Sequence, residues 1–235
     1  MPAPDFTARL REIQEARRSV LCVGLDPDPE RLPRHLTEGR TLPDAVLAFN
    51  TAIVEATAGA ACAFKLNFAF FEIMGREGWR VLEETVARIP AGTLVVADAK
   101  RGDIGNSARF YAEAVFTHLK CDAVTVAPYM GRDSVAPFLQ YPGRAAFVLA
   151  RTSNPGAADF QERALGDAPL YLQVARAVEA WGAGAPGTAG LVVGATDERS
   201  LATLREACPA LPFLIPGVGA QGGDAAAVRL SAMTD

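Results

Sequence analysis

The sequence of 235 residues contains few of the side chains from which metal and redox centres are built. Its two histidines, His35 and His118, stand far apart, and its four cysteines stand singly without a CxxC pair. No set of histidine, cysteine and carboxylate has the spacing of metal ligands. We therefore expect no metal and no cofactor, and we expect reduced, buried thiols in a cytoplasmic protein.

Other functional classes are disfavoured by further absences. No apolar run approaches the roughly 18 residues that span a membrane, and the N-terminus lacks the basic and apolar regions of a signal peptide. A net charge of −4 argues against binding to a nucleic-acid backbone. Gly24–Pro27 lacks the GxGxxG spacing of a dinucleotide-binding turn, and no Ser/His/Asp set is apparent.

The sequence does contain a regular alternation of apolar runs with helix-like segments. The runs are nearly all apolar, which is typical of strands buried on both faces of a parallel sheet. Seven strands are predicted: Ser19–Asp26, Ala63–Asn67, Thr93–Ala99, Ala123–Pro128, Ala145–Thr152, Ala189–Thr196 and Pro212–Gly217. This pattern indicates βαβ units in an α/β fold, and its regularity favours a (β/α)8 TIM-type barrel.

Helices are predicted before, between and after these strands. They are Pro4–Arg17, Asp44–Thr57, Phe71–Ile89, Ser107–Leu119, Leu170–Trp181, Asp197–Cys208 and Asp224–Ala232. Asp44 is the predicted N-cap of its helix. Because a closed barrel needs eight strands, we expect the eighth βα unit to be absent from this sequence, which otherwise forms one domain over residues 1–235.

Charged residues stand where the predicted strands end, which is where barrel enzymes place their active sites. The first strand ends in Asp26, the second in Lys65 and Asn67, and the third in Asp98 and Lys100. The two-residue period of a strand puts Asp98 and Lys100 on one face, and likewise Lys65 and Asn67. Since buried charges must be paired, alternating ammonium and carboxylate groups are expected there.

Such an array also determines the protonation state of its lysines. Neighbouring carboxylates favour the ammonium form of Lys100, which then suits the stabilisation and protonation of a carbanion better than Schiff-base formation. The alternative is a purely structural cluster of salt bridges, since DxK pairs are common.

A glycine-rich segment, Pro216–Gly223, follows the seventh predicted strand. It has four glycines, and such a loop can direct backbone N–H groups at a phosphate, aided by the dipole of the following helix. Late strand ends of barrels often bind phosphate, although an ordinary glycine-rich turn has the same composition.

The segment DAKRGDIGNS, Asp98–Ser107, closely resembles the signature of the orotidine 5′-monophosphate decarboxylases, in its bacterial form. Further segments resemble this family in the same order along the chain: Gly24–Pro27, Phe64–Asn67, Pro128–Gly131, Arg151–Gly156 and Gly217–Gly223. A lone DxKxxD motif would be weak evidence for the family, because related sugar-phosphate enzymes share it. Six ordered matches over nearly the whole chain are specific.

The resemblance implies decarboxylation of orotidine 5′-monophosphate to uridine 5′-monophosphate without a cofactor. Lys100 resembles the proton donor to C6 of the pyrimidine, and Asp98 the carboxylate beside the departing CO2. Lys65 resembles the lysine that completes the charge chain and contacts the ribose. Asp103 and Ile104 resemble residues that enter the partner's site across a homodimer interface.

The resemblance also implies a set of substrate contacts. Asp26 and Ser107 resemble contacts to the ribose hydroxyls, Ser153 the serine that reads the pyrimidine edge, and Gln221 a glutamine that bridges base and phosphate. The complete predicted substrate-binding set is Asp26, Asn67, Ile104, Ser107, Ser153, Pro216, Gln221 and Gly222.

One feature departs from the family pattern: no segment matches the arginine that grips phosphate on the family's eighth strand. Three rival interpretations also remain open. They are a metal-dependent sugar-phosphate decarboxylase or synthase, a Schiff-base lysine enzyme, and a barrel that binds a nucleotide without catalysis.

Overall fold

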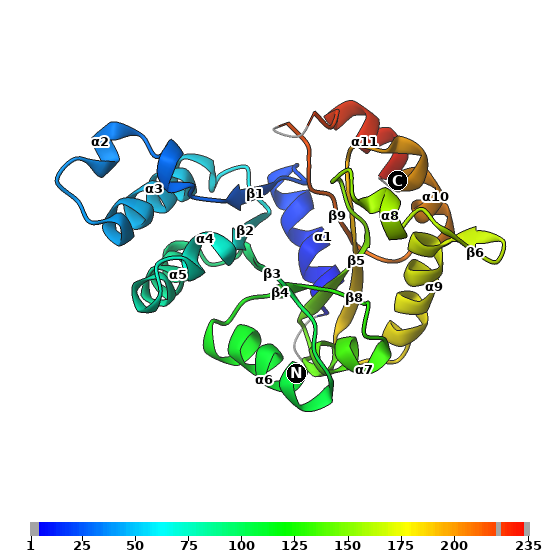
Figure 1. The fold of residues 1–235 in the computed structure, drawn as a ribbon. Helices are drawn as coiled ribbons and strands as arrows, with labels where there is room; N and C mark the ends of the chain where they lie inside the picture. The colour runs from blue at the N-terminus through cyan, green and yellow to red at the C-terminus, as the bar shows by residue number, and fades with distance from the viewer. Residues whose placement is uncertain (1–4, 220–221, 233–235) are drawn as a thin grey trace. The chain divides into compact units, whose positions relative to one another are not determined.

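The computed structural model describes residues 5–219 and 222–232, and Figure 1 traces this chain. The chain divides into two compact units. The first contains residues 1–99 and 110–124, and the second contains residues 100–109 and 125–235. Strands β3 and β4 each contribute residues to both units. The single domain expected over residues 1–235 stays a prediction.

All seven predicted strands are present, in a sheet with the hydrogen-bonded order β1-β2-β3-β4-β5-β8-β9. They are β1 Cys22–Leu25, β2 Ala63–Asn67, β3 Leu94–Arg101, β4 Ala123–Val126, β5 Ala145–Arg151, β8 Thr188–Val193 and β9 Phe213–Leu214. The pairs β1–β2, β2–β3, β5–β8 and β8–β9 are parallel. Every residue of β4 is buried, which explains why its sequence shows no alternation of apolar and polar residues.

The first helix precedes the first strand, and the others follow strands along the chain. The helices are α1 Phe6–Arg17, α2 Arg34–Thr37, α3 Leu42–Thr57, α4 Ala69–Glu72, α5 Arg76–Arg88, α6 Gly105–Glu113, α7 Arg132–Val135, α8 Ala157–Phe160, α9 Leu170–Gly182, α10 Glu198–Ala207 and α11 Ala225–Ala232. Short 3-10 helices cover Pro29–Arg31 and Ala136–Gln140. The predicted helix Ser107–Leu119 is not α-helical throughout, because Ala114–His118 forms a π-helical turn.

In the first unit, two arginines fasten the amphipathic helix α1 to the strands. Arg9 contacts Asp122 at 2.9 Å, and the buried Asp122 also accepts a hydrogen bond from the backbone N–H of Val95 at 2.9 Å. Arg17 donates to the hydroxyl of Thr93 at 2.7 Å. A charged helix is thereby fixed to a buried strand through satisfied polar contacts.

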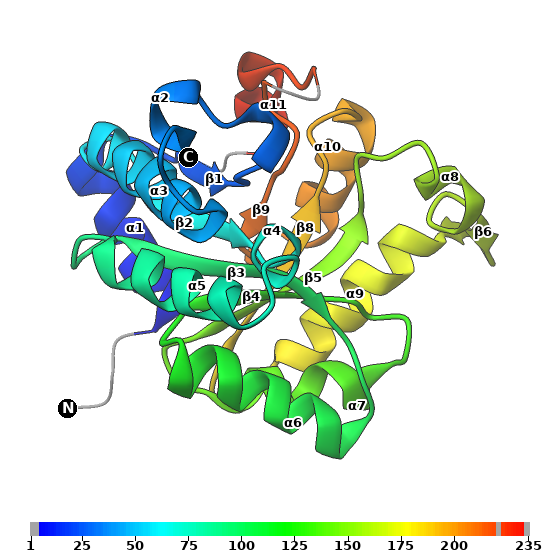
Figure 2. The same ribbon diagram turned by 60° about the vertical axis from the view of Figure 1, so that its left-hand side comes forward.

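Helices α3 and α5 lie side by side in the first unit (Figure 2). Asn50 of α3 donates to Thr85 of α5 at 3.2 Å within this buried contact. The predicted N-cap of α3 was wrong: Thr41 caps the helix, its hydroxyl accepting from the N–H of Asp44. Pro43 suits the first turn, so the helix begins two residues before Asp44.

The predicted helix Phe71–Ile89 is interrupted. It consists of α4 and α5, with Gly75 at a φ of 57° between them. A left-handed backbone ends the hydrogen-bond pattern of one helix and lets the next start in a new direction. The segment contains two glycines, Gly75 and Gly78, and only Gly75 interrupts the helix, so the sequence did not indicate the break.

In the second unit, α9 lies along β5 and β8, and α10 packs on α9 and α11. Arg205 of α10 donates to the carbonyl oxygens of Leu211 at 2.9 Å and Ala232 at 2.8 Å. Its guanidinium also lies 3.6 Å from the ring centroid of Phe213 in β9. One side chain therefore joins α10, α11 and the seventh strand of the sheet.

A small antiparallel hairpin in the second unit was not predicted. It pairs β6 Ala164–Leu165 with β7 Ala168–Pro169 through a turn at Gly166, whose φ is 69°. Two-residue strands carry no measurable period, so only the glycine could have indicated the turn.

The close contact between α4 and α5 generates a stability prediction. A methyl group on Gly78 would lie 1.7 Å from the carbonyl oxygen of Phe71. We expect Gly78→Ala to lower the free energy of unfolding by about 2 kcal/mol, although alanine normally favours a helix. Urea unfolding measures this. Gly59→Ala is the matched control, because nothing lies within 4 Å of its added methyl group. Equal stability of the two variants would contradict the prediction.

Candidate active site

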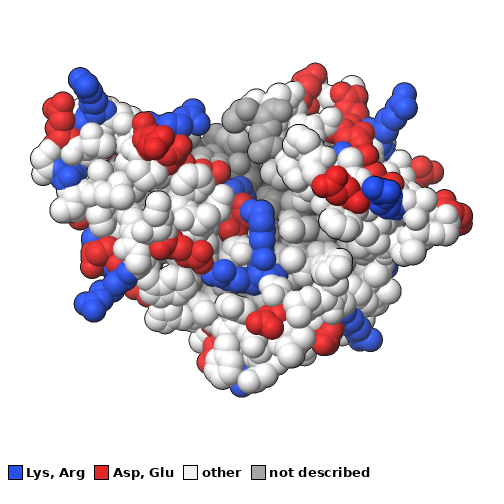
Figure 3. Space-filling view, viewed as in Figure 1, with Lys and Arg blue, Asp and Glu red and all other residues white. Residues whose placement is uncertain are grey.

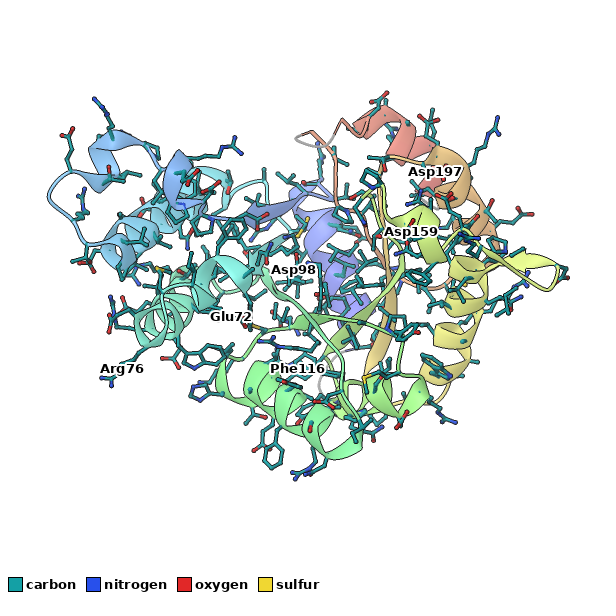
Figure 4. The ribbon with its side chains drawn as sticks, in the orientation of Figure 1. Glu72, Arg76, Asp98, Phe116, Asp159 and Asp197 are labelled. Atoms are coloured by element: carbon teal, nitrogen blue, oxygen red, sulfur yellow. The ribbon has the colours of Figure 1, made fainter. Side chains whose placement is uncertain are left out.

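A cluster of three charged side chains lies at the strand ends of the first unit. The Nζ atom of Lys65 is 2.9 Å from Oδ2 of Asp98 and 3.5 Å from Oδ1 of Asp26. Parallel pairing places Gly24 opposite Lys65 and Asn67 opposite Asp98, so β1, β2 and β3 bring the three residues together. The structure therefore brings together three of the charged residues that the sequence placed at the strand ends, and Figure 4 labels Asp98 on β3.

The pair of Lys65 and Asp98 is largely withdrawn from water. Their side chains are 14% and 10% exposed, whereas that of Asp26 is 44% exposed. Burial alone would lower the pKa of Lys65, but the carboxylates of Asp98 and Asp26 outweigh it and raise the pKa above its ordinary value. Lys65 is therefore an ammonium ion at neutral pH, and it compensates the charge of Asp98.

Cys22 also lies close to this cluster, and nothing in the sequence indicated that position. Burial raises the pKa of its thiol to about 12, against the opposing effect of Lys65 and with the support of Asp98. Cys22 is only half-buried as a residue, in contrast to the other three cysteines, and all four are free. A neutral thiol beside a charged pair adds no charge of its own, so the ammonium and carboxylate groups dominate the electrostatics there.

Asn67 has a local role in addition to its predicted one. It is half-buried, and its Oδ1 accepts a hydrogen bond from the N–H of Ala69 at 3.3 Å, at the start of α4. The amide thus stabilises the turn that follows β2.

Lys100 belongs to the second unit and has an unusual backbone. Its φ is 45°, and its N–H donates to Thr125 Oγ1 at 2.9 Å. The other non-glycine residues with positive φ in the described chain, Arg18 and Lys120, follow helices, whereas Lys100 lies inside β3. The alternation rule needs extended backbone, so it does not determine the direction of this exposed side chain. A lysine in left-handed backbone is strained, and such strain concentrates at functional sites.

The residues after β3 that the sequence singled out lie in the second unit. Asp103 is half-buried and accepts a hydrogen bond from the N–H of Ile104 at 2.7 Å. Ile104 is 59% exposed, which is high for a large apolar side chain. Ser107 is half-buried in the first turns of α6.

Ser153 follows β5 in the second unit and is half-buried. Gly194 lies directly against it: a methyl group on Gly194 would approach the backbone N of Ser153 to 2.8 Å. Glycine at position 194 is therefore required for the observed position of Ser153.

The glycine-rich loop uses much of its own hydrogen-bonding capacity. The N–H groups of Gly219, Gly222 and Gly223 donate to carbonyl oxygens within the loop, at 3.3, 2.9 and 2.9 Å. Asp224 also accepts from the N–H of Ala226 at 2.8 Å, which puts a carboxylate at the start of α11. These contacts leave fewer donors for a phosphate than the sequence suggested. Pro216 is half-buried, and Gln221 lies outside the described residues.

The described residues contain no group of three or more histidine, cysteine, aspartate or glutamate side chains that could hold a metal ion. His118 instead contacts Glu83 at 2.8 Å on the surface, and His35 is exposed. Among the helices of the described residues, none has the length and apolar character of a membrane span. Acidic and basic side chains are interspersed over the face seen in Figure 3.

Parallel strands with ammonium and carboxylate groups at their carboxyl ends define the class: a (β/α)-barrel enzyme. The family model described as orotidine 5′-phosphate decarboxylase / HUMPS family matches residues 19–234. The chain belongs to this family, and the resemblance seen in the sequence is confirmed.

Individual relatives agree with this assignment. An orotidine 5′-phosphate decarboxylase of Herpetosiphon aurantiacus is 47% identical over 221 residues, which cover 93% of this chain and 81% of the relative. The structure of Leishmania donovani OMP decarboxylase is 42% identical with a TM-score of 0.85, covering 98% of this chain and 84% of that one. Leishmania donovani UMP synthase is 44% identical with a TM-score of 0.88, covering 97% of this chain and 48% of that one. The α/β fold of the TIM-barrel type is thereby confirmed.

The buried ion pair generates a prediction on pH. The folded pKa of Lys65 lies above 10.5, so its contribution to stability is complete below pH 10.5 and is lost as the pH rises through the folded value. Asp98→Asn leaves a buried ammonium without its closest partner. We expect the free energy of unfolding to fall by about 3 kcal/mol at neutral pH, with the difference from the wild type narrowing above pH 10.5.

Urea unfolding between pH 7 and 11 measures this difference. Asp26→Asn is the control, because its carboxylate is more exposed and more distant, and we expect a loss below about 1 kcal/mol. A difference between wild type and Asp98→Asn that stays constant up to pH 11 would rule out the assigned coupling.

Proposed function

We propose that this chain decarboxylates orotidine 5′-monophosphate to uridine 5′-monophosphate, a step in the synthesis of pyrimidine nucleotides, without metal or organic cofactor. Membership of the family supports this reaction. The observation that carries it is the largely buried ion pair of Lys65 and Asp98, whose Nζ and Oδ2 atoms are 2.9 Å apart. Asp98 lies two residues before Lys100 in the sequence. A pair of this kind has the charge that a site for an anionic reaction needs in advance of the substrate.

The proposed reaction breaks the bond between C6 and the carboxylate of the substrate. The electron pair of that bond stays on C6, CO2 departs, and the ammonium of Lys100 transfers a proton to C6. Lys100 then regains a proton from water. Since no group on the substrate delocalises the carbanion, its stabilisation comes from the positive charge of Lys100.

The other charged residues have supporting roles in this proposal. Asp98 and Asp103 direct negative charge towards the departing carboxylate, and Lys65 compensates Asp98 and contacts the ribose. The substrate-binding residues are Asp26, Asn67, Ile104, Ser107, Ser153, Pro216, Gln221 and Gly222. Binding of the phosphate contributes energy for orientation of the base, as remote groups do in many enzymes.

We also propose a homodimer in which Asp103 and Ile104 enter the partner's site. The exposure of Ile104 supports this, because large apolar side chains that reach the surface are suited to a contact with another protein. A cytoplasmic location is proposed from the four free cysteines, which suit a reducing compartment.

Replacement of Lys100 tests the proposed reaction. We expect Lys100→Ala to lower kcat at least about a thousandfold, because one side chain supplies both electrostatic stabilisation and the proton. Lys100→Gly is expected to be equally inactive, yet more stable than Lys100→Ala by about 1 kcal/mol, because glycine relieves the positive φ. The assay follows the ultraviolet absorbance of orotidine 5′-monophosphate in the presence of EDTA.

Lys120→Ala is the matched control, since Lys120 also has a positive φ, of 60°, and it should keep full activity. Activity that EDTA abolishes would favour the metal-dependent rival of the same family. Near-wild-type turnover by Lys100→Ala would refute the mechanism.

Mixing two inactive variants tests the shared site. Lys100→Ala and Asp103→Ala each inactivate both active sites of their own homodimer. Their heterodimer restores one intact site, so an equal mixture should regain about a quarter of the wild-type activity if subunits exchange freely. Lys100→Ala mixed with Asp98→Asn is the control and should regain none, because both residues act in one subunit. No recovery in the first mixture would place Asp103 outside the partner's site.

A further inference from the structure

The segment that follows β5 is held by contacts that the proposed reaction does not use. The pairing of β5 with β8 shifts between Leu149 and Arg151, so Ala150 is an extra residue in a β-bulge. A bulge reverses the side-chain alternation and gives the next side chain a new direction. That next side chain is Arg151.

Arg151 is an almost buried cation, with its side chain 11% exposed. Its guanidinium contacts Glu162 at 2.5 Å and lies 3.9 Å from Asp197. Asp197, labelled in Figure 4, caps α10. Arg151 also donates to the carbonyl oxygen of Thr152. That carbonyl belongs to the peptide group that supplies the backbone N–H of Ser153, so Arg151 orients this peptide plane.

Gln161 holds the preceding peptide group. Its Oε1 accepts from the backbone N–H of Thr152 at 2.8 Å, and its Nε2 donates to the hydroxyl of Thr152 at 2.8 Å. The carbonyl oxygen of Arg151, in the same peptide group, accepts from the N–H of Gly194 at 2.7 Å. Two successive peptide planes before Ser153 are thus fixed by hydrogen bonds, and Gly194 packs against Ser153 itself.

We propose that Arg151 and Gln161 are positioning residues that hold Ser153 and so determine which pyrimidine base the site accepts. The proposal rests on the proposed function, in which Ser153 reads the pyrimidine edge. Neither residue contacts the substrate. They act by fixing the direction in which the hydroxyl and N–H of Ser153 meet the base, where small displacements of a hydrogen-bonding group change recognition strongly.

Binding of UMP and CMP to the intact protein tests this, because the two nucleotides differ only at the base edge. The wild type should prefer UMP by at least about tenfold, as expected of a site built to hydrogen-bond one edge. Arg151→Met and Gln161→Met should each reduce the ratio of the dissociation constant of CMP to that of UMP at least about fivefold. Each substitution should do so by weakening the binding of UMP while leaving the binding of CMP unchanged. Gln161→Glu keeps the acceptor for the N–H of Thr152, so this variant should retain most of the wild-type preference for UMP over CMP.

Matched controls come from the same unit. Arg163 and Gln173 each donate one side-chain hydrogen bond to a backbone carbonyl, at 3.2 and 3.3 Å, away from Ser153. Arg163→Met and Gln173→Met should therefore leave the ratio unchanged. In a Ser153→Ala background, Gln161→Met should produce a smaller loss of preference than in the wild type, because the hydroxyl is already gone and only the N–H contact remains to be misplaced.

An unchanged ratio in Arg151→Met and Gln161→Met would overturn the proposal, as would an equal weakening of UMP and CMP or additive effects with Ser153→Ala. If Arg151→Met does not fold, the Gln161 variants decide alone. Failure of the proposed function is distinguishable, because it appears in the wild type as absence of turnover of orotidine 5′-monophosphate. Wild-type turnover with an unchanged ratio in the variants overturns only the positioning roles.

Discussion

The charged part of the candidate site depends on the 2.9 Å contact between Lys65 and Asp98. Both side chains are largely buried, and an isolated buried charge costs several kcal/mol in lost hydration. Each residue therefore requires the other, and both require β2 and β3 to pair in the observed register. A shift of one residue would turn Asp98 to the opposite face of the sheet and leave an unpaired ammonium. The ion pair thus ties the chemistry of the site to the register of the strands.

Around this pair, the backbone departs from regular structure where side chains of the site need particular directions. Lys100 adopts a left-handed conformation inside β3, and an extra residue in β5 re-directs the chain before Ser153. Gly194 provides the space that any larger residue would remove. The regular strands make the site rigid, and these few irregular positions set the directions of its side chains. This combination is common in enzymes built on parallel sheets.

The glycine-rich loop shows how composition can suggest a function that geometry then narrows. Four glycines at a late strand end predicted a phosphate-binding loop, but three of their N–H groups donate within the loop. Glycines allow tight turns as readily as they allow approach of a ligand. The sequence cannot distinguish these uses, because the partners of each N–H depend on the fold.

By itself, the sequence determined the order and number of the seven strands, since apolar runs buried on both faces are readable without tertiary information. It also determined the family, through segments such as Asp98–Ser107 in the right order. Only the tertiary structure decided the break at Gly75, the cap at Thr41 and the left-handed backbone of Lys100. The sequence predicted alternating ammonium and carboxylate groups at the strand ends, but only the tertiary structure showed that Lys65 pairs with Asp98, and Arg151 with Glu162. Strand patterns follow local hydrophobicity, whereas these features depend on contacts between residues distant in the chain, which no local pattern records.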